Sequence, residues 1–79
     1  GRYLGGWKHG RYSGLGSYSY KLGISYEGGF LDGLMHGHGK FCWPITVGDG
    51  SITYIGEFER DRRVRGKVFD GQMNLISNY

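Results

Sequence analysis

The chain repeats a pattern of aromatic residues and glycines over most of its length. Residues 26–39 align without a gap with residues 3–16, and the aligned windows share one tyrosine and five glycines. A further position exchanges Trp7 for Phe30. A third copy begins at Tyr54. Self-similarity at a fixed period is typical of repeat architectures, so the fold and the function have to be inferred from a repeating unit.

Within each copy the aromatic residues and glycines alternate with other residues, as they would along a β-strand. In the first copy we expect a hairpin loop at residues 9–13 and a return strand at residues 14–20. An aromatic ring can lie flat over a neighbouring strand only where no Cβ stands beneath it, which explains the glycines and fixes the strand register. No stretch carries apolar residues at helical spacing between caps, so the sequence predicts an all-β chain.

The third copy departs from the pattern on both sides. Five residues are inserted before it, within residues 44–51, where Pro44 marks a strand end and Asp49-Gly50 is a good turn dipeptide. After Phe58 the pattern ends, because Asp61 and Arg65 replace glycines and Gly66 is displaced by one residue. Residues 67–76 are then predicted to form a plain hairpin with a turn at Asp70-Gly71.

The pattern Tyr-x-Gly-x-(Trp/Phe)-x-x-Gly-x-x-x-Gly-x-Gly, at a period of about 23 residues, resembles the MORN repeat (membrane occupation and recognition nexus). The resemblance implies tandem β-hairpins in a single elongated, twisted antiparallel sheet. It divides the chain into a first repeat at residues 2–23, a second with a longer exit loop at residues 24–50, and a degenerate third with a terminal hairpin at residues 51–79. The structural repeat positions are Tyr3, Gly5, Trp7, Gly14, Gly16, Tyr26, Gly28, Phe30, Gly37, Gly39, Tyr54, Gly56 and Phe58.

The resemblance implies a non-catalytic module that binds a protein partner or a second copy of itself. It suggests a scaffold in a cytoskeletal or ciliary assembly. Cys42 is the only cysteine, so no internal disulfide can form and a cytoplasmic, reducing compartment is expected. The chain has no apolar run near 18 residues, so we expect no segment that spans a membrane.

Three chemical alternatives are weaker than the repeat interpretation. His36, His38 and Cys42 share a parity and could in principle bind zinc, but no fourth ligand is evident and the repeat itself explains the histidines. Cys42 has no orienting group that would make it a nucleophile. The Gly-x-Gly sequences at Gly14 and Gly37 lack the following helix of a phosphate loop. We therefore expect no enzyme activity, metal, cofactor or nucleic-acid partner.

Two sets of residues are left unassigned by the repeat. Apolar residues outside the pattern are candidates for contact with a partner protein: Tyr12, Tyr20, Leu31, Trp43, Ile52 and Ile55. A basic run is an alternative site for an anionic membrane surface, each residue contributing about 1 kcal/mol: Arg60, Arg62, Arg63, Arg65 and Lys67. On a regular strand, Arg63, Arg65 and Lys67 would project together. A solvated hairpin tip is the simpler interpretation of this run.

Overall fold

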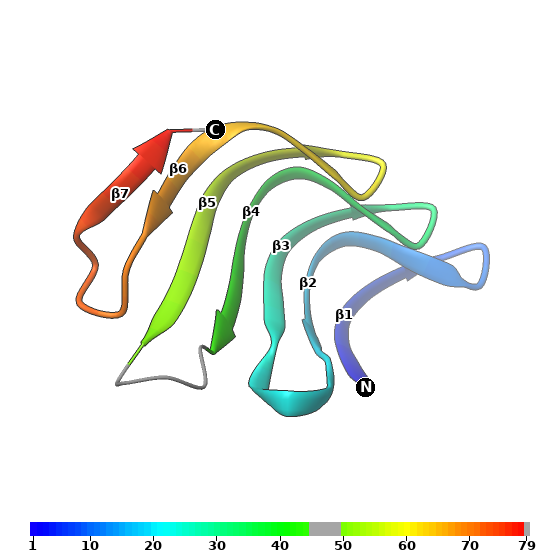
Figure 1. The fold of residues 1–79 in the computed structure, drawn as a ribbon. Coiled ribbons are helices and arrows are strands. Elements are labelled where there is room, and N and C mark those ends of the chain that lie inside the picture. Colours follow the sequence, from blue (N-terminus) through cyan, green and yellow to red (C-terminus); the bar gives the residue numbers. More distant parts are fainter. Residues whose placement is uncertain (45–49, 79) are drawn as a thin grey trace.

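The computed structural model describes residues 1–44 and 50–78, which form one antiparallel sheet with its strands in chain order (Figure 1). The strands are β1 (Arg2–Lys8), β2 (Arg11–Ser19), β3 (Ser25–Leu31), β4 (Leu34–Pro44), β5 (Ser51–Glu59), β6 (Arg62–Phe69) and β7 (Leu75–Asn78). A 3₁₀ turn, η1 (Lys21–Gly23), joins β2 to β3. With extents of 41 × 25 × 14 Å the sheet is a single elongated layer, which confirms the predicted fold class.

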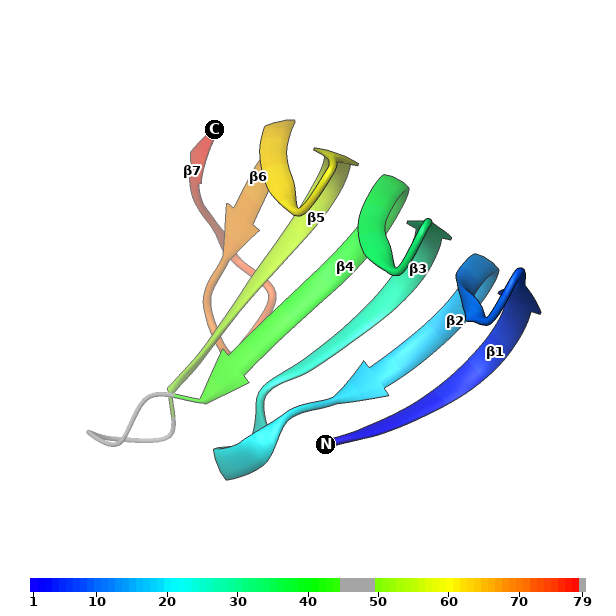
Figure 2. The ribbon, with the colours of Figure 1, turned by 90° about the vertical axis from the view of Figure 1, so that its right-hand side faces the viewer.

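The three repeat hairpins end in two-residue turns, and all three turns lie at the same end of the strands (Figure 2). Both central residues have positive φ in every turn, as a type I′ turn requires: His9 54° and Gly10 76°, Asp32 52° and Gly33 86°, Arg60 48° and Asp61 71°. The predicted loop at residues 9–13 is therefore wrong, since β2 already begins at Arg11. Aspartate tolerates the left-handed conformation, so the third turn forms without its glycine.

Each return strand contains a β-bulge after the turn. The register passes from Gly5 opposite Gly16 to Trp7 opposite Tyr12, so β2 carries two extra residues. The second hairpin repeats this arrangement. In the third hairpin only Val64 is extra, because Glu57 lies opposite Arg65 and Phe58 opposite Arg63. Because this bulge is one residue shorter, Gly66 still lies opposite Gly56 although it is displaced by one residue in the sequence. The hairpin geometry of the repeat therefore continues past Phe58, where the sequence pattern ends.

The registers align glycines and aromatic residues into two adjacent rows across the sheet. The glycine row is Gly5, Gly16, Gly28, Gly39, Gly56 and Gly66. The aromatic row is Tyr3, Tyr18, Tyr26, Phe41 and Tyr54, followed by Val68. A Cβ added at Gly39 would lie 2.5 Å from Cε1 of Tyr26, and one added at Gly66 would lie 2.7 Å from Cζ of Tyr54. The predicted stacking of rings over glycines is confirmed.

The face that carries the aromatic row, called here the aromatic face, also holds the core. Tyr26, Phe30, Tyr54 and Phe58 are buried there. Phe30 meets the Tyr3 ring of the preceding repeat edge-on at 5.1 Å, and Phe58 meets Tyr26 in the same way at 5.1 Å. The aromatic face lies on the hollow side of the curved sheet. The core is therefore shared between successive repeats and depends on their stacking.

The tyrosine of each repeat also closes a local hydrogen bond. The hydroxyl groups of Tyr3, Tyr26 and Tyr54 donate to the carbonyl oxygens three residues later, at Gly6 (2.7 Å), Gly29 (2.9 Å) and Glu57 (3.1 Å). The third copy keeps this bond although Glu57 replaces glycine. A tyrosine at this position therefore satisfies its hydroxyl group while its ring covers the glycine row.

The C-terminal hairpin of β6 and β7 forms as predicted, with a longer turn than the Asp70-Gly71 pair suggests. The Asp70 carboxylate accepts hydrogen bonds from the backbone N–H groups of Gln72 and Asn74, each at 2.9 Å. The Asp70 N–H donates to the Asn74 carbonyl at 2.9 Å. Hydrogen bonding to the charged carboxylate, above all from Asn74, holds the pKa of Asp70 below its usual value. The turn thus spans residues 70–74.

The insertion before the third copy lies mostly outside the described residues. β4 ends at Pro44, as predicted, and Pro44 lies opposite Ser51 at the start of β5. The predicted turn at Asp49-Gly50 includes a residue outside the described part of the chain. The five inserted residues therefore leave the pairing of β4 with β5 continuous.

Candidate functional site

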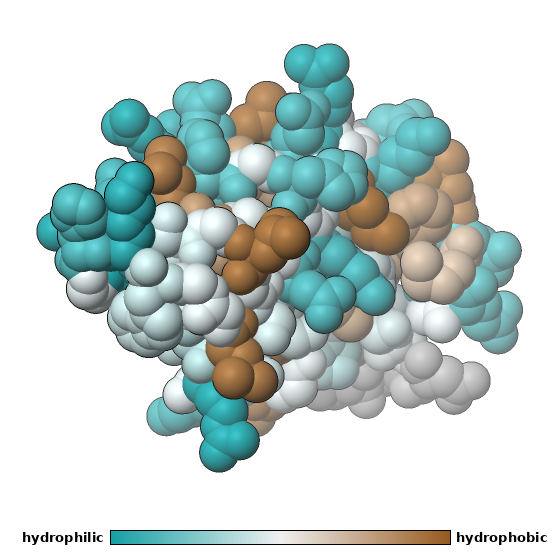
Figure 3. Space-filling view, turned by 180° about the vertical axis from the view of Figure 1, so that it is seen from behind, coloured by the Kyte–Doolittle hydropathy of each residue, from teal (hydrophilic) through white to brown (hydrophobic). Residues whose placement is uncertain are grey.

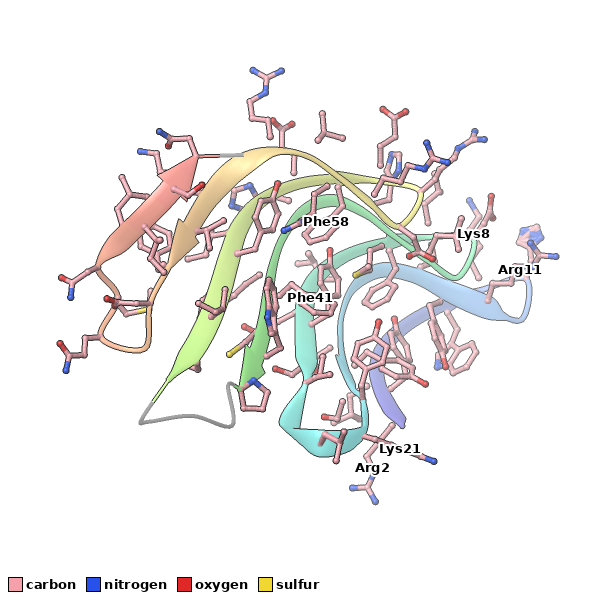
Figure 4. The ribbon with its side chains drawn as sticks, viewed as in Figure 1. Arg2, Lys8, Arg11, Lys21, Phe41 and Phe58 are labelled. Atoms are coloured by element: carbon pink, nitrogen blue, oxygen red, sulfur yellow. The ribbon has the colours of Figure 1, made fainter. Side chains whose placement is uncertain are left out.

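A hollow on the aromatic face spans the last two repeats. It has a volume of about 300 Å³ and is lined by Met35, Phe41, Trp43, Phe58, Asp61 and Arg63. β4 contributes the first three side chains, β5 contributes Phe58, and the third hairpin contributes the two charged residues. Figure 4 shows Phe41 and Phe58 on the hollow side of the arched strands. The site is thus an apolar, largely aromatic floor with charged groups at its rim, and we call it the aromatic groove.

Hydrogen bonds from the third turn to the second hairpin hold the charged rim in place. The Asp61 carboxylate accepts a hydrogen bond from the Met35 N–H at 2.7 Å, and the Asp61 N–H donates to the Met35 carbonyl at 2.9 Å. At the equivalent place between the first two repeats, the Gly33 N–H donates to the Tyr12 carbonyl at 3.0 Å. Replacing glycine by Asp61 therefore adds a charge-assisted bond between neighbouring hairpins.

The guanidinium group of Arg63 lies over the ring of Tyr54, with Cζ 5.5 Å from the ring centroid. This is a cation–π distance, and it places Arg63 on the aromatic face. Burial raises the pKa of Tyr20 on the same face, and the negative charge of Asp61 adds to this shift. The residues that line the groove therefore include one cation, Arg63, and one anion, Asp61.

The residues predicted to contact a partner are distributed over both faces of the sheet. Tyr12 and Trp43 are half-buried against the core cluster on the aromatic face. Tyr20 lies near them, 5.9 Å from Phe41 between ring centroids, and Ile52 lies opposite Trp43 on β5. Leu31 and Ile55 have the opposite strand parity and belong to the other face. Of these six predicted residues, Trp43 is the one that lines the groove.

Sequence reasoning missed most of the groove. Met35 occupies a repeat position without a fixed residue type, Phe58 was assigned a structural role, and Phe41 was not among the candidates for partner contact. Asp61 was interpreted as a break in the pattern. Only the curvature of the sheet brings these residues of β4, β5 and β6 around one hollow. The one feature of the sequence that could have indicated the groove is Asp61, a charged residue where the earlier repeats have a turn glycine.

The basic run at residues 60–67 does not form a single surface. Arg63 lies on the aromatic face, whereas Arg65 forms an exposed ion pair with Glu57 at 3.5 Å and shares the opposite face with Lys67. The prediction that Arg63, Arg65 and Lys67 project together is therefore wrong for Arg63, because the bulge at Val64 changes the strand alternation. Arg60 and Arg62 lie at the exposed third turn and at the start of β6.

The face opposite the aromatic face, called here the outer face, carries exposed leucines. Leu4 is 70% exposed and Leu15 is 80% exposed. Seen from behind, apolar side chains appear as separate spots among polar ones (Figure 3). The described residues in this view therefore form no continuous apolar area comparable to the aromatic groove.

The histidines and the cysteine do not converge on one point. Nδ1 of His36 accepts a hydrogen bond from the Arg60 N–H at 3.4 Å, and the thiol of Cys42 lies 3.7 Å from Oγ1 of Thr53. Within residues 1–44 and 50–78, no group of three or more His, Cys, Asp or Glu side chains could hold a metal ion. No helix in this described part is long and apolar enough to cross a membrane.

The fold and its glycine and aromatic rows agree with the sequence comparison. A sequence model of the MORN repeat matches residues 3–21, 26–45 and 54–67, which together exceed half of the chain. The chain belongs to the MORN repeat family. The third match ends within β6, so it includes the return strand whose glycine is displaced. MORN repeats are non-catalytic repeat modules that generally serve interaction with proteins or membranes.

Curated relatives with MORN repeats include Alsin of Homo sapiens and Alsin of Rattus norvegicus. Each is 37% identical to this chain over 68 residues, which is 86% of this chain and 4% of the relative. The chain thus spans about 4% of the length of these relatives. The similarity is to a small segment of each protein.

Proposed function

We propose that the chain is a non-catalytic interaction module whose aromatic groove binds an apolar segment of a protein partner. The observation that carries the proposal is the hollow of about 300 Å³ on the aromatic face, with an apolar floor and charges only at its rim. An apolar pocket with a few charged groups at its edge is the usual form of a site that buries a partner's side chain and orients it. Membership of a family of interaction modules supports the same function.

Two details of the groove indicate that its lining is already packed and hydrogen-bonded before a partner binds. Trp43 and Phe41 pack edge-on at 5.4 Å between ring centroids and together form an aromatic floor. Asp61 is fixed by the Met35 N–H, so its carboxylate is held at the rim without the need for a ligand. Side chains that already pack or form hydrogen bonds in the free protein lose less conformational freedom on binding, which lowers the ordering cost.

Site-specific photocrosslinking in cells tests the proposal. A photoreactive phenylalanine derivative at Trp43 should give reproducible crosslinks to a defined protein. The same group at Lys40, on the same strand but the outer face, should not give them. Crosslinking of both positions to the same proteins, or of neither to any protein, would contradict a partner site in the groove.

The alternative of an anionic membrane surface is separated from this proposal by vesicle flotation. A membrane module would float with vesicles that contain anionic lipid and would be released at high salt. We expect no flotation that depends on Arg60, Arg62 and Lys67, because the basic run is divided between the faces. A cytoskeletal or ciliary assembly is also part of the proposal and is supported by the family resemblance. A cytoplasmic location is supported by the single cysteine, Cys42.

A further inference from the structure

Asp61 is the one acidic residue among those that line the aromatic groove. Oδ1 of its carboxylate accepts a hydrogen bond from the Met35 N–H at 2.7 Å, and its own N–H donates to the Met35 carbonyl at 2.9 Å. These two bonds hold both the backbone and the side chain of Asp61 against the second hairpin. A partner that covers the groove would therefore bury a carboxylate that is not free to turn toward solvent.

The charge at the rim restricts what can cover the groove. Burying a carboxylate is costly unless a cation or hydrogen-bond donors replace the lost water, so a wholly neutral segment would leave Asp61 uncompensated. The one cation that lines the groove, Arg63, has its guanidinium over the ring of Tyr54, with Cζ 5.5 Å from the ring centroid. The long side chain of an arginine can keep its charged end in water when its stem is covered. The charge that the partner has to supply is therefore positive.

The aromatic floor attracts a cation as well. The rings of Phe41 and Trp43 meet at 62° with 5.4 Å between their centroids, and the Tyr20 ring lies 5.9 Å from Phe41. Tyr20 is 39% exposed, and Phe41 and Trp43 are half-buried, so part of each ring is accessible from the groove side. Aromatic faces carry partial negative charge and bind ammonium and guanidinium groups. The floor and the acidic rim thus favour the same kind of ligand.

The effect of Asp61 on neighbouring tyrosines agrees with this sign. Burial is the largest cause of the raised pKa of Tyr20 and of Tyr26, and the negative charge of Asp61 adds to both shifts. A field that disfavours a phenolate on this face favours a cation there. Figure 4 shows four of the protein's own cations at the ends of the strands, away from the labelled Phe41 and Phe58: Arg2, Lys8, Arg11 and Lys21.

Of the two basic side chains that a partner protein can offer, arginine suits the groove better than lysine. The side chains of Met35, Phe41 and Phe58 carry no oxygen or nitrogen that could replace the water around a cation. A lysine ammonium is strongly hydrated and would lose that water without compensation. A guanidinium group is more weakly hydrated, stacks on aromatic rings and donates from its edge to a carboxylate.

We infer that the aromatic groove selects a partner segment in which an arginine stands between apolar residues. The guanidinium pairs with Asp61 and packs on the aromatic floor, and the flanking apolar side chains cover the rest of the hollow. This inference rests on the proposed function, because it names the chemistry of the segment that the groove binds. It adds a specificity that an apolar groove by itself would not have.

The test compares three peptides, acetyl-Ser-Leu-Xaa-Leu-Ser-amide with arginine, lysine or citrulline at the central position. Citrulline keeps the shape of arginine but is neutral. Binding to the 79-residue chain is followed by the NMR signal of the Trp43 indole N–H, which is distinguished from that of the second tryptophan with Trp7→Phe. We expect the arginine peptide to bind at least about threefold more tightly than the other two, from one ion pair and one cation–π contact.

The peptide series separates this inference from the proposed function. Equal affinity for the arginine and citrulline peptides would overturn the inference and leave an apolar groove that binds a neutral segment. Failure of all three peptides to shift the Trp43 signal would also overturn it, and crosslinking from Trp43 would then decide the proposed function by itself.

Asp61→Asn tests the acidic rim with little change in geometry. Asparagine keeps an oxygen for the Met35 N–H and tolerates the positive φ of the turn. The variant should bind the arginine peptide about three- to fivefold more weakly and the citrulline peptide within about twofold of the native chain. The control Asp32→Asn makes the same change in the second turn, at a hollow shared with Lys8 and Arg11, and should alter neither affinity by more than about twofold. Equal weakening by both substitutions would show general electrostatic attraction and overturn the site.

Arg63→Gln tests the sign of the charge that the groove prefers. Removing this cation should leave binding of the arginine peptide unchanged or strengthen it by up to about twofold. A fourth peptide with glutamate at the central position should bind more weakly than the citrulline peptide, because its charge repels Asp61. Weakening of arginine-peptide binding by Arg63→Gln as large as that by Asp61→Asn, or tighter binding of the glutamate peptide, would overturn the inference. The NMR spectrum of each variant shows whether the sheet is intact, and the peptide comparison on the native chain does not depend on any variant.

Discussion

The second and third repeat hairpins have nearly the same geometry but differ in their glycines. The second turn contains Gly33 and its bulge contains Gly37, with φ angles of 86° and 88°. The third turn contains Asp61 instead, and its bulge is one residue shorter and contains no glycine. Both hairpins nevertheless keep a tyrosine ring over a glycine of the return strand, Tyr26 over Gly39 and Tyr54 over Gly66.

The difference shows that the glycines of this repeat serve two separable purposes. A glycine that supplies positive φ can be replaced by aspartate in the turn or lost together with a bulge residue. A glycine beneath a tyrosine ring cannot be replaced in this way, because the Cβ of any other residue would overlap the ring atoms. The chain therefore moves the register of β6 by one residue and retains Gly66 in the row.

The largest expected effect is steric. Gly39→Ala and Gly66→Ala each place a methyl group against a tyrosine ring, and each should lower the free energy of unfolding by about 3 kcal/mol. Urea denaturation measures the change. The control is Gly37→Ala, whose added Cβ meets nothing within 4 Å and whose cost of about 1 to 2 kcal/mol comes from positive φ alone. Equal losses at Gly37 and Gly39 would contradict the two-purpose interpretation.

The second effect concerns the buried tyrosine of the second hairpin. Burial raises the pKa of Tyr26 from 10.0 to about 12. Because the folded protein disfavours the phenolate, stability is fully present below pH 10 and falls as the pH rises from about 10 to about 12. The urea midpoint measured across this range should drop in the native chain and drop less in Tyr26→Phe. A pH dependence that Tyr26→Phe leaves unchanged would show that other groups cause it.

A smaller effect should be equal in the two hairpins. Tyr26→Phe and Tyr54→Phe remove hydroxyl groups that donate to the carbonyl oxygens of Gly29 and Glu57. At neutral pH each substitution should lower the free energy of unfolding by about 1 kcal/mol, the net contribution of one such hydrogen bond. A loss confined to Tyr26→Phe would show that the third repeat keeps the position of the tyrosine without using its hydroxyl group.

The smallest effect belongs to a contact found only in the third hairpin. Glu57 and Arg65 form an ion pair whose side chains are more than half exposed. A double-mutant cycle of Glu57→Gln and Arg65→Gln should give a coupling energy of less than about 1 kcal/mol, decreasing with added salt. A coupling energy that persists at high salt would show that this pair contributes to the geometry of the shortened bulge.

Much of the fold could be predicted because its rules are local. Alternation along Tyr26, Gly28 and Phe30 indicates a strand, and a second copy at the same spacing indicates stacked hairpins. The bulges could not be located, since a bulge changes the pairing of a strand without leaving a distinctive residue at Val64. The predicted loop at residues 9–13 failed for the same reason: the extra residues lie within the return strand, beyond the turn.

The candidate sites were harder to predict than the fold. The basic run at residues 60–67 is continuous in the sequence, but its side chains do not share one face. Because of the bulge, Arg63 lies on the aromatic face, whereas Arg65 pairs with Glu57 on the outer face.

The sequence alone determined the repeat, the antiparallel sheet and the glycine beneath each tyrosine, because these depend on contacts between residues close along the chain. Tertiary structure decided the course of the glycine row through Gly66 and the formation of the aromatic groove. These features depend on register and curvature, which are set by packing between hairpins more than 20 residues apart, as between Tyr26 and Phe58.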